Sequence, residues 1–136
     1  MNSPDTTKSD LAWVAARFVK ATAGVLYAVV LSGDGLALAD GGSLPADMTE
    51  RMAAVASGVY ALAVGISEKF GLGAYEQSIL RFVDGHVVIT ALAKGAALAV
   101  VTETDARLGV VAHEMALFAA RLGENFDPAP RTVAGP

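Results

Sequence analysis

A long apolar segment between Met48 and Phe70 constrains the fold of this chain more than any other feature. Its length and composition predict one helix, and no charged residue lies between Arg51 and Glu68. At about 100° per residue, one side of this helix is a bulky apolar stripe and another is a stripe of small residues. The bulky stripe comprises Val55, Val59, Leu62 and Ile66, with Met52 at its edge, and the small stripe comprises Ala54, Gly58, Ala61 and Gly65.

These two stripes predict different contacts for the helix. A helix that covers one face of a small domain normally has a polar back, and this helix lacks one. A chain of 136 residues has too small a core to bury such a helix on every side. We therefore expect the bulky stripe to cover the domain's own sheet, and the small stripe to let a second backbone approach closely. The sequence predicts self-association, with the small stripe in the interface.

The apolar composition has a second explanation, a membrane span. Hydrophobic residues make up 54% of the chain, and the mean hydropathy is +0.49. A span needs about 18–20 consecutive apolar residues, whereas the Met52–Ser67 run is shorter and is diluted by Ser57, Gly58 and Gly65. We therefore expect an oligomer and no membrane span. The polar start, Met1–Asp10, lacks the apolar region of a secretory signal, which predicts a cytoplasmic protein.

Charge and motif content exclude several functional classes. The net charge is −4, and the ten basic residues are scattered singly, which argues against nucleic acid as a partner. Because the chain has no cysteine, it has no disulfide framework and no thiolate chemistry. We find no phosphate-binding loop, no metal-ligand spacing and no nucleophilic serine motif. The two histidines, His86 and His113, are expected to be solvated. The sequence predicts neither catalysis nor a cofactor.

Turn signals divide the chain into helix, two strands, helix, three strands and helix. Asp10 is expected to cap the first helix, and Thr104 or Asp105 the last. The pair Asp84-Gly85 predicts a tight hairpin turn. The expected strands are Val25–Leu31, Leu36–Ala39, Tyr75–Phe82, His86–Leu92 and Ala96–Val101. Because tight turns join antiparallel strands, the expected fold is an α/β sandwich of the α+β type, a five-stranded antiparallel sheet with helices on both faces. We expect one domain over residues 10–127 and disordered tails at 1–9 and 128–136.

Trp13 is the residue that a purely structural role explains least well. It lies off the apolar face of the first helix, with Arg17 one turn further along. Tryptophan is frequent at interaction hot spots, and an arginine at this spacing can stack on the indole. The alternative is that Trp13 packs against a neighbouring loop or tail of its own chain. Trp13 and Arg17 are therefore the candidate partner-binding residues.

Several local phrases, taken with the order of elements, resemble the roadblock/dynein light chain family. The similarity extends from about Asp10 to Asp127, and it is greatest to short bacterial members found beside Ras-like GTPases in actinobacterial operons. The phrases are Leu11–Val14, Gly24–Val25, Ala28–Ser32, Asp34–Leu36, Met52–Gly58, Gln77, Ile79, Ala97–Val100 and Leu108–Met115.

This resemblance implies a homodimer formed by the long helix and the edge of the third strand. It adds Tyr75, Gln77 and Ile79 to the expected interface and makes one sheet continuous across two chains. It also implies a non-enzymatic regulator or scaffold for a Ras-like small GTPase. A histidine-kinase-like membrane protein is a further implied partner, which would recruit the complex to the membrane.

A different class of function remains open from the sequence, a small-molecule sensor domain. PAS- and GAF-like folds also layer helices on an antiparallel sheet of five or six strands. Such a sensor requires a polar-lined cavity over the sheet. The expected strands are rich in alanine and valine, which favours a closed core and hence the interaction module.

Overall fold

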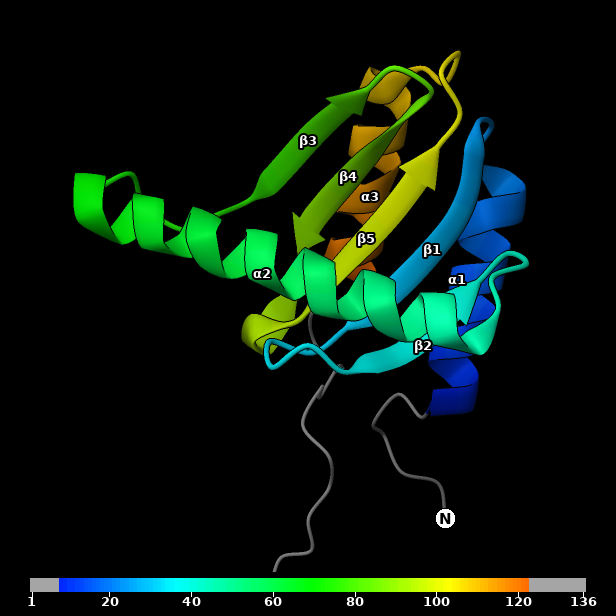
Figure 1. Cartoon of the computed structure of the whole chain (residues 1–136), viewed down its shortest axis with the longest axis horizontal. Helices are drawn as coiled ribbons and strands as arrows, with labels where there is room; N and C mark the ends of the chain where they lie inside the picture. The colour runs from blue at the N-terminus through cyan, green and yellow to red at the C-terminus, as the bar shows by residue number, and fades with distance from the viewer. Residues whose placement is uncertain (1–7, 123–136) are drawn as a thin grey trace, which may run out of the picture.

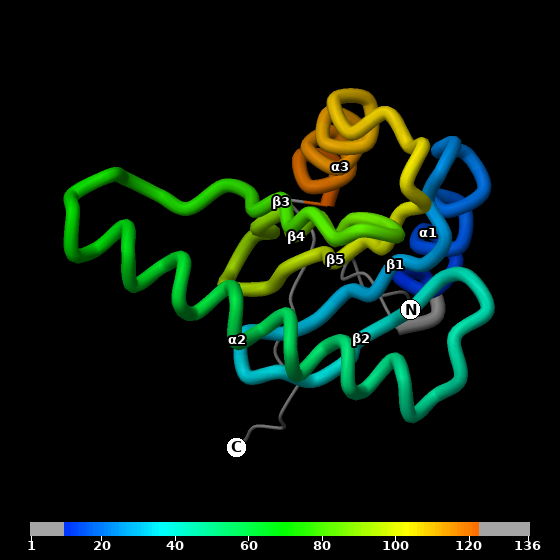
Figure 2. Tube along the Cα trace, turned by 45° about the horizontal axis from the view of Figure 1, so that its top comes forward, coloured from blue at the N-terminus to red at the C-terminus, as the bar shows by residue number. Residues whose placement is uncertain are grey.

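A five-stranded antiparallel sheet separates α2 from α1 and α3 (Figures 1 and 2). The structure is a computed structural model, and it describes residues 8–122. Its elements are α1 (Lys8–Ala21), β1 (Val25–Leu31), β2 (Ala37–Gly41), α2 (Ala46–Phe70), β3 (Gln77–Phe82), β4 (Gly85–Ala91), the 3-10 turn η1 (Ala93–Gly95), β5 (Ala97–Thr102) and α3 (Leu108–Leu122). The strands lie in the order β2-β1-β5-β4-β3. The predicted fold class and order of elements are therefore confirmed.

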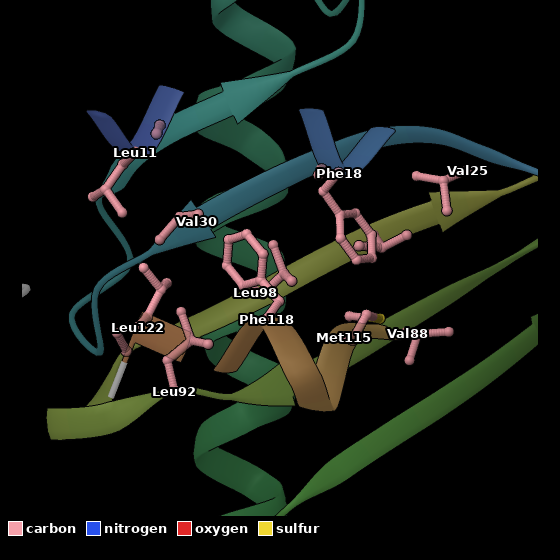
Figure 3. Close-up of a cluster of buried hydrophobic side chains, with 14 of the residues drawn as sticks. Leu11, Phe18, Val25, Val30, Val88, Leu92, Leu98, Met115, Phe118 and Leu122 are labelled. Atoms are coloured by element: carbon pink, nitrogen blue, oxygen red, sulfur yellow. The ribbon is translucent and has the colours of Figure 1, made fainter. Parts of the chain in front are cut away.

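Side chains along the central strands point alternately to the two faces of the sheet, so a hydrophobic core forms on each face. On the face that α1 and α3 cover, Val30, Val88 and Leu98 pack against helix residues that include Phe18 and Phe118 (Figure 3). On the opposite face, a smaller set of strand residues packs against α2. That second cluster comprises Val29, Leu31, Ile89, Ala97 and Ala99 of the strands, with Ala53 and Ala56 of the helix.

The orientation of α2 differs from the prediction. The apolar residues of α2 that are fully buried against the strands are small, Ala53 and Ala56, and Met52, Val59 and Tyr60 pack beside them partly buried. Most of the bulky stripe faces outward, and Val55 is 66% and Leu62 73% exposed. The expectation that this stripe covers the domain's own sheet is therefore wrong for Val55, Leu62 and Ile66. Only Met52 and Val59 of the stripe pack partly buried against it. Where Val29, Leu31 and Ile89 supply large side chains, the small residues of α2 let the helix lie close to the sheet.

Several predicted boundaries also shift. The first helix begins at Lys8 rather than at an Asp10 cap, so Lys8 and Ser9 are not part of a tail. The last helix begins at Leu108, later than a cap at Thr104 or Asp105 predicts. The strand ends differ from the predicted ones by one or two residues, except for β1. The rest of the predicted N-terminal tail, the domain end at residue 127 and the tail at 128–136 lie outside the described residues.

Gly85 has a different role from the predicted one. The hairpin turn between β3 and β4 consists of Val83 and Asp84, and Gly85 is the first residue of β4. A Cβ atom at Gly85 would lie 2.5 Å from the carbonyl oxygen of Thr102 on the neighbouring strand. Glycine is therefore required here for close approach of two strands rather than for a turn.

Candidate functional site

One side of α2 is an exposed apolar strip, which we call the bulky flank. It consists of Val55, Leu62, Ile66 and Phe70, all exposed, with Val59 half-buried. At about 100° per residue, this flank lies roughly a right angle around the helix from Ala53 and Ala56. Burial of an exposed leucine or phenylalanine side chain stabilises a complex by about 1.5–3 kcal/mol. The bulky flank is therefore a candidate contact surface.

A groove runs between the N-terminal half of α2, including Val55 of the bulky flank, and the uncovered end of the sheet. It has a volume of about 350 Å³ and is lined by Tyr27, Leu44, Met48, Arg51, Met52, Val55 and Val101. Figure 1 shows that α2 crosses the sheet near one end, so that the other ends of β1, β5, β4 and β3 extend beyond it. Arg51 is the single charged side chain in this lining, and the groove therefore suits an apolar partner.

The C-terminal end of α2 extends past the edge of the sheet at β3 (Figures 1 and 2). Tyr60 of α2 contacts Tyr75 edge-to-face, with 5.4 Å between the ring centroids. The Tyr75 hydroxyl lies 2.7 Å from Ser78 Oγ and donates to the Ile89 carbonyl oxygen at 3.1 Å. Burial raises the pKa of Tyr75, and the hydrogen bond with Ser78 partly opposes this. These contacts join the projecting end of α2 to β3 and β4.

The free edge of β3 is the second part of this surface. The strand order places β3 at one side of the sheet. Ala91 donates to the carbonyl oxygen of Glu76, and hydrogen-bonded pairs alternate along an antiparallel ladder. The backbone groups of Gln77, Ile79 and Arg81 therefore point away from β4, toward the open edge. An unpaired edge of this kind is a template for another strand.

The predicted dimer residues lie in two places, the small stripe on α2 and the segment that leads into and forms β3. In the small stripe, Ala54, Gly58 and Ala61 are exposed and Gly65 is half-buried. This stripe points roughly away from the sheet, and a Cβ atom at Gly58 or Gly65 would meet no atom within 4 Å. Of the β3 set, Tyr75 and Gln77 are half-buried and Ile79 is exposed. The side-chain amide of Gln77 donates to Thr90 Oγ1 at 2.8 Å. Only the backbone groups of Gln77 are therefore available for pairing at the open edge.

Two further properties of the described residues bear on function. By length and composition, one helix, Ala46–Phe70, is apolar enough to cross a membrane, and 11% of its most apolar window is buried. An exposed apolar strip of this kind can be covered by a protein or by a lipid surface. Within residues 8–122, no three His, Asp or Glu side chains lie close enough together to hold a metal ion.

Trp13 and Arg17 lie on the other face of the sheet from α2. The Arg17 guanidinium carbon is 5.0 Å from the centroid of the Trp13 ring, a cation–π contact. Trp13 nevertheless remains 61% exposed. Both residues line a groove of about 280 Å³ between α1 and α3. The structure thus brings the predicted pair together and adds Arg121 of α3, which sequence reasoning missed.

The two histidines have different environments. His113 is exposed on α3, in agreement with the prediction. The prediction for His86 is wrong, because this residue is buried, and its Nδ1 atom lies 3.3 Å from Thr102 Oγ1. Its position beside a hairpin turn suggested solvent, whereas pairing of β4 with two neighbouring strands encloses it.

Comparison with known proteins gives consistent results. The family model for the Roadblock/LC7 domain matches residues 11–102. Among solved structures, one Roadblock/LC7 domain from Streptomyces avermitilis has a TM-score of 0.76 and 29% identity over 82% of this chain and 92% of that one. A second such domain from the same organism has a TM-score of 0.67 and 32% identity over 82% and 96%. Myxococcus xanthus MglB has a TM-score of 0.75 and 17% identity over 90% and 89%. No protein of curated function matches the chain.

Proposed function

The chain belongs to the Roadblock/LC7 domain family, and from this premise we propose that it is a homodimeric, non-enzymatic module that binds a Ras-like small GTPase. The proposal of a dimer rests on two features of one protomer that would fit each other across a two-fold axis. The end of α2 projects beyond β3, while one end of the sheet on the same side is left without a helix (Figure 1). A two-fold axis can bring each feature onto the other in the partner.

In the proposed dimer, the β3 edges of two protomers pair antiparallel, and the axis runs perpendicular to the sheet. Each α2 then lies over the uncovered sheet end of its partner, next to Tyr27 and Val101. The two α2 helices lie side by side and antiparallel, so that the bulky flanks face each other. Gly58 and Gly65 lie at the outer margin of this contact, where they leave room for the side chains of the partner helix. Such an interface is isologous, as in most homodimers.

Light scattering over a concentration series tests the dimer. The expected mass is about twice the 13.9 kDa of one chain. A parallel series with anionic and with neutral lipid vesicles tests whether the chain binds a lipid surface instead. A monomer at high micromolar concentration contradicts the proposal. A monomer that binds the vesicles instead would assign the bulky flank to a lipid surface.

The proposal of a GTPase partner rests on family membership and on the resemblance to members encoded beside Ras-like GTPases. Trp13 and Arg17 are the proposed contacts, since they form an exposed aromatic and cationic pair on a face that the dimer leaves open. Trp13→Ala should weaken binding by about 2 kcal/mol or more if Trp13 is a hot spot. We further propose that the complex is cytoplasmic and that a histidine-kinase-like membrane protein recruits it.

Calorimetry tests the GTPase partner separately from the dimer. Titration with GTP alone is expected to release no heat, whereas titration with a nucleotide-loaded GTPase encoded beside this chain should give a saturable signal. An exposed leucine on the β1–β2 hairpin, Leu36, supplies the control variant Leu36→Ala, which should bind normally. Tight binding of free GTP, or no binding of any GTPase encoded nearby, would contradict the proposal.

A further inference from the structure

The groove between α1 and α3 has two distinct ends, because the helices that line it run in opposite directions. Its floor includes Phe18 and Phe118, which pack edge-to-face with 5.6 Å between ring centroids. Figure 3 shows Leu11 of α1 and Leu122 of α3 at the same end of the underlying cluster, with Phe18 and Phe118 in its middle and Met115 further along. The beginning of α1 therefore lies next to the end of α3, and the two helices run antiparallel across this floor.

This arrangement separates opposite charges along the groove. Trp13 of α1 and Arg121, in the last turn of α3, line one end. Arg17 lies one turn further along α1, and its guanidinium stacks back over the Trp13 ring. Glu114 lies seven residues before Arg121 on α3, which is about 10 Å at 1.5 Å per residue. One end of the groove is thus cationic and aromatic, and the carboxylate lies at the other. This cationic end stands out in a chain whose net charge is −4.

The chemistry of the cationic end favours one kind of ligand. A guanidinium that lies over an indole face keeps its in-plane N–H donors available. Those donors match the geometry of a carboxylate, which two arginines can bind from both sides. The exposed indole and the phenylalanine floor offer apolar contact immediately beside it. We propose that this end of the groove binds a segment of a partner protein that carries a carboxylate next to an aromatic or large aliphatic side chain.

The position of Glu114 favours a protein segment over an anionic lipid surface. A membrane presents many negative charges, which would repel a carboxylate about 10 Å from the cationic end. A peptide segment can place an acidic side chain at Arg17 and Arg121 and a basic or neutral one at Glu114. This inference rests on the proposed function in that it states what the Trp13 contact recognises, and it applies to the chain as monomer or dimer.

Selection from a random library of 12-residue peptides tests the proposal, with the full chain as bait. Enriched peptides should contain Asp or Glu adjacent to an aromatic or large aliphatic residue more often than the starting library does. The enrichment should be lost with Trp13→Ala and with Arg121→Glu as baits. Arg107→Glu makes the same charge change at an exposed arginine outside the groove, and it should leave the enrichment unchanged.

Fluorescence gives a second readout, because Trp13 is the only tryptophan of the chain. A synthetic copy of the most enriched peptide should change the Trp13 emission saturably. Its affinity should fall by about tenfold or more with Arg121→Glu, as for other hydrogen bonds to charged groups. Reversal of the peptide's acidic residues to lysine should abolish binding to the unmodified chain and restore measurable binding to Arg121→Glu.

Several outcomes would overturn the proposal. These are no enrichment, enrichment of basic or uncharged peptides, or enrichment that persists with Arg121→Glu. Enrichment only with a variant that ends at Leu122 would assign the groove to the chain's own C-terminal segment. A larger Trp13 response to phosphatidylserine vesicles than to the peptide would assign it to lipid. Because the GTPase takes no part in this selection, its result is separable from failure of the calorimetry.

Discussion

Truncation of Leu62 is the sharpest perturbation of the proposed dimer. Leu62 is 73% exposed in the protomer, so Leu62→Ala removes little that the single chain uses for folding. Full burial of a leucine is worth about 1.5–3 kcal/mol, and about three quarters of this is still available for an interface. The two-fold axis doubles the effect, to about 2–4 kcal/mol per dimer. The dimer dissociation constant should therefore rise roughly 30- to 900-fold.

Sedimentation equilibrium measures this constant directly. Urea unfolding at a concentration where both proteins are monomeric should give a free energy within about 0.5 kcal/mol of the unmodified chain. Leu36→Ala removes the same atoms from an exposed site away from the bulky flank, and it should leave dissociation unchanged. Gly58→Leu should weaken the dimer less than Leu62→Ala. The reverse order of effects would refute the role of the bulky flank and place the contact on the small stripe.

Three further substitutions test separate parts of the structure. Ile79→Pro removes an N–H that points to the open edge of β3, so size-exclusion chromatography should show a weakened dimer, whereas Ile79→Ala keeps that N–H and should weaken it less. An intact dimer with Ile79→Pro would place the interface elsewhere. Because burial raises the pKa of Tyr75 above its usual 10.0, the stability that the neutral hydroxyl contributes is complete below pH 10 and declines as the pH rises toward the raised pKa. Urea unfolding at about pH 9 and pH 11 should show a smaller loss for Tyr75→Phe than for the unmodified chain, and an equal loss would contradict this. Gly85→Ala places a Cβ atom 2.5 Å from the Thr102 carbonyl oxygen. It should lower the free energy of unfolding, measured with urea, by about 1–3 kcal/mol. An unchanged midpoint of unfolding would show that β5 moves aside freely.

The order of elements was predictable because each boundary has a local cause. The β-branched run Val25–Leu31 and the glycines around each turn determine strand and loop without reference to the rest of the chain. The resemblance to roadblock proteins is likewise carried by local phrases. Gly85 is an exception, because its reason is a contact with Thr102 on another strand, and a sequence pattern does not encode which strands become neighbours.

The orientation of α2 could not be predicted, for a related reason. Helical periodicity identifies an inward face only when the remaining faces are polar, and α2 is apolar or small on all of them. Ala53 and Ala56 were not part of either predicted stripe, yet they are the apolar residues of α2 that the sheet buries fully. Of the groove between α1 and α3, the sequence predicted only the pair Trp13 and Arg17. Arg121, which also lines it, lies more than one hundred residues away in sequence, and only the antiparallel packing of α1 and α3 brings it near.

Electron spin resonance on two single-cysteine variants tests the central claim, the antiparallel dimer, most directly. The natural chain has no cysteine, and Ala61 and Glu50 are exposed on similar sides of α2. If the axis lies at the centre of the bulky flank, near Leu62, spin labels at Ala61→Cys should be less than about 25 Å apart across the dimer. Labels at Glu50→Cys should be roughly 35–40 Å apart, because twelve residues separate Glu50 from the axis on each helix at about 1.5 Å per residue. Short distances at both positions would indicate parallel helices, and no dipolar coupling at either would indicate a monomer; both results contradict the account.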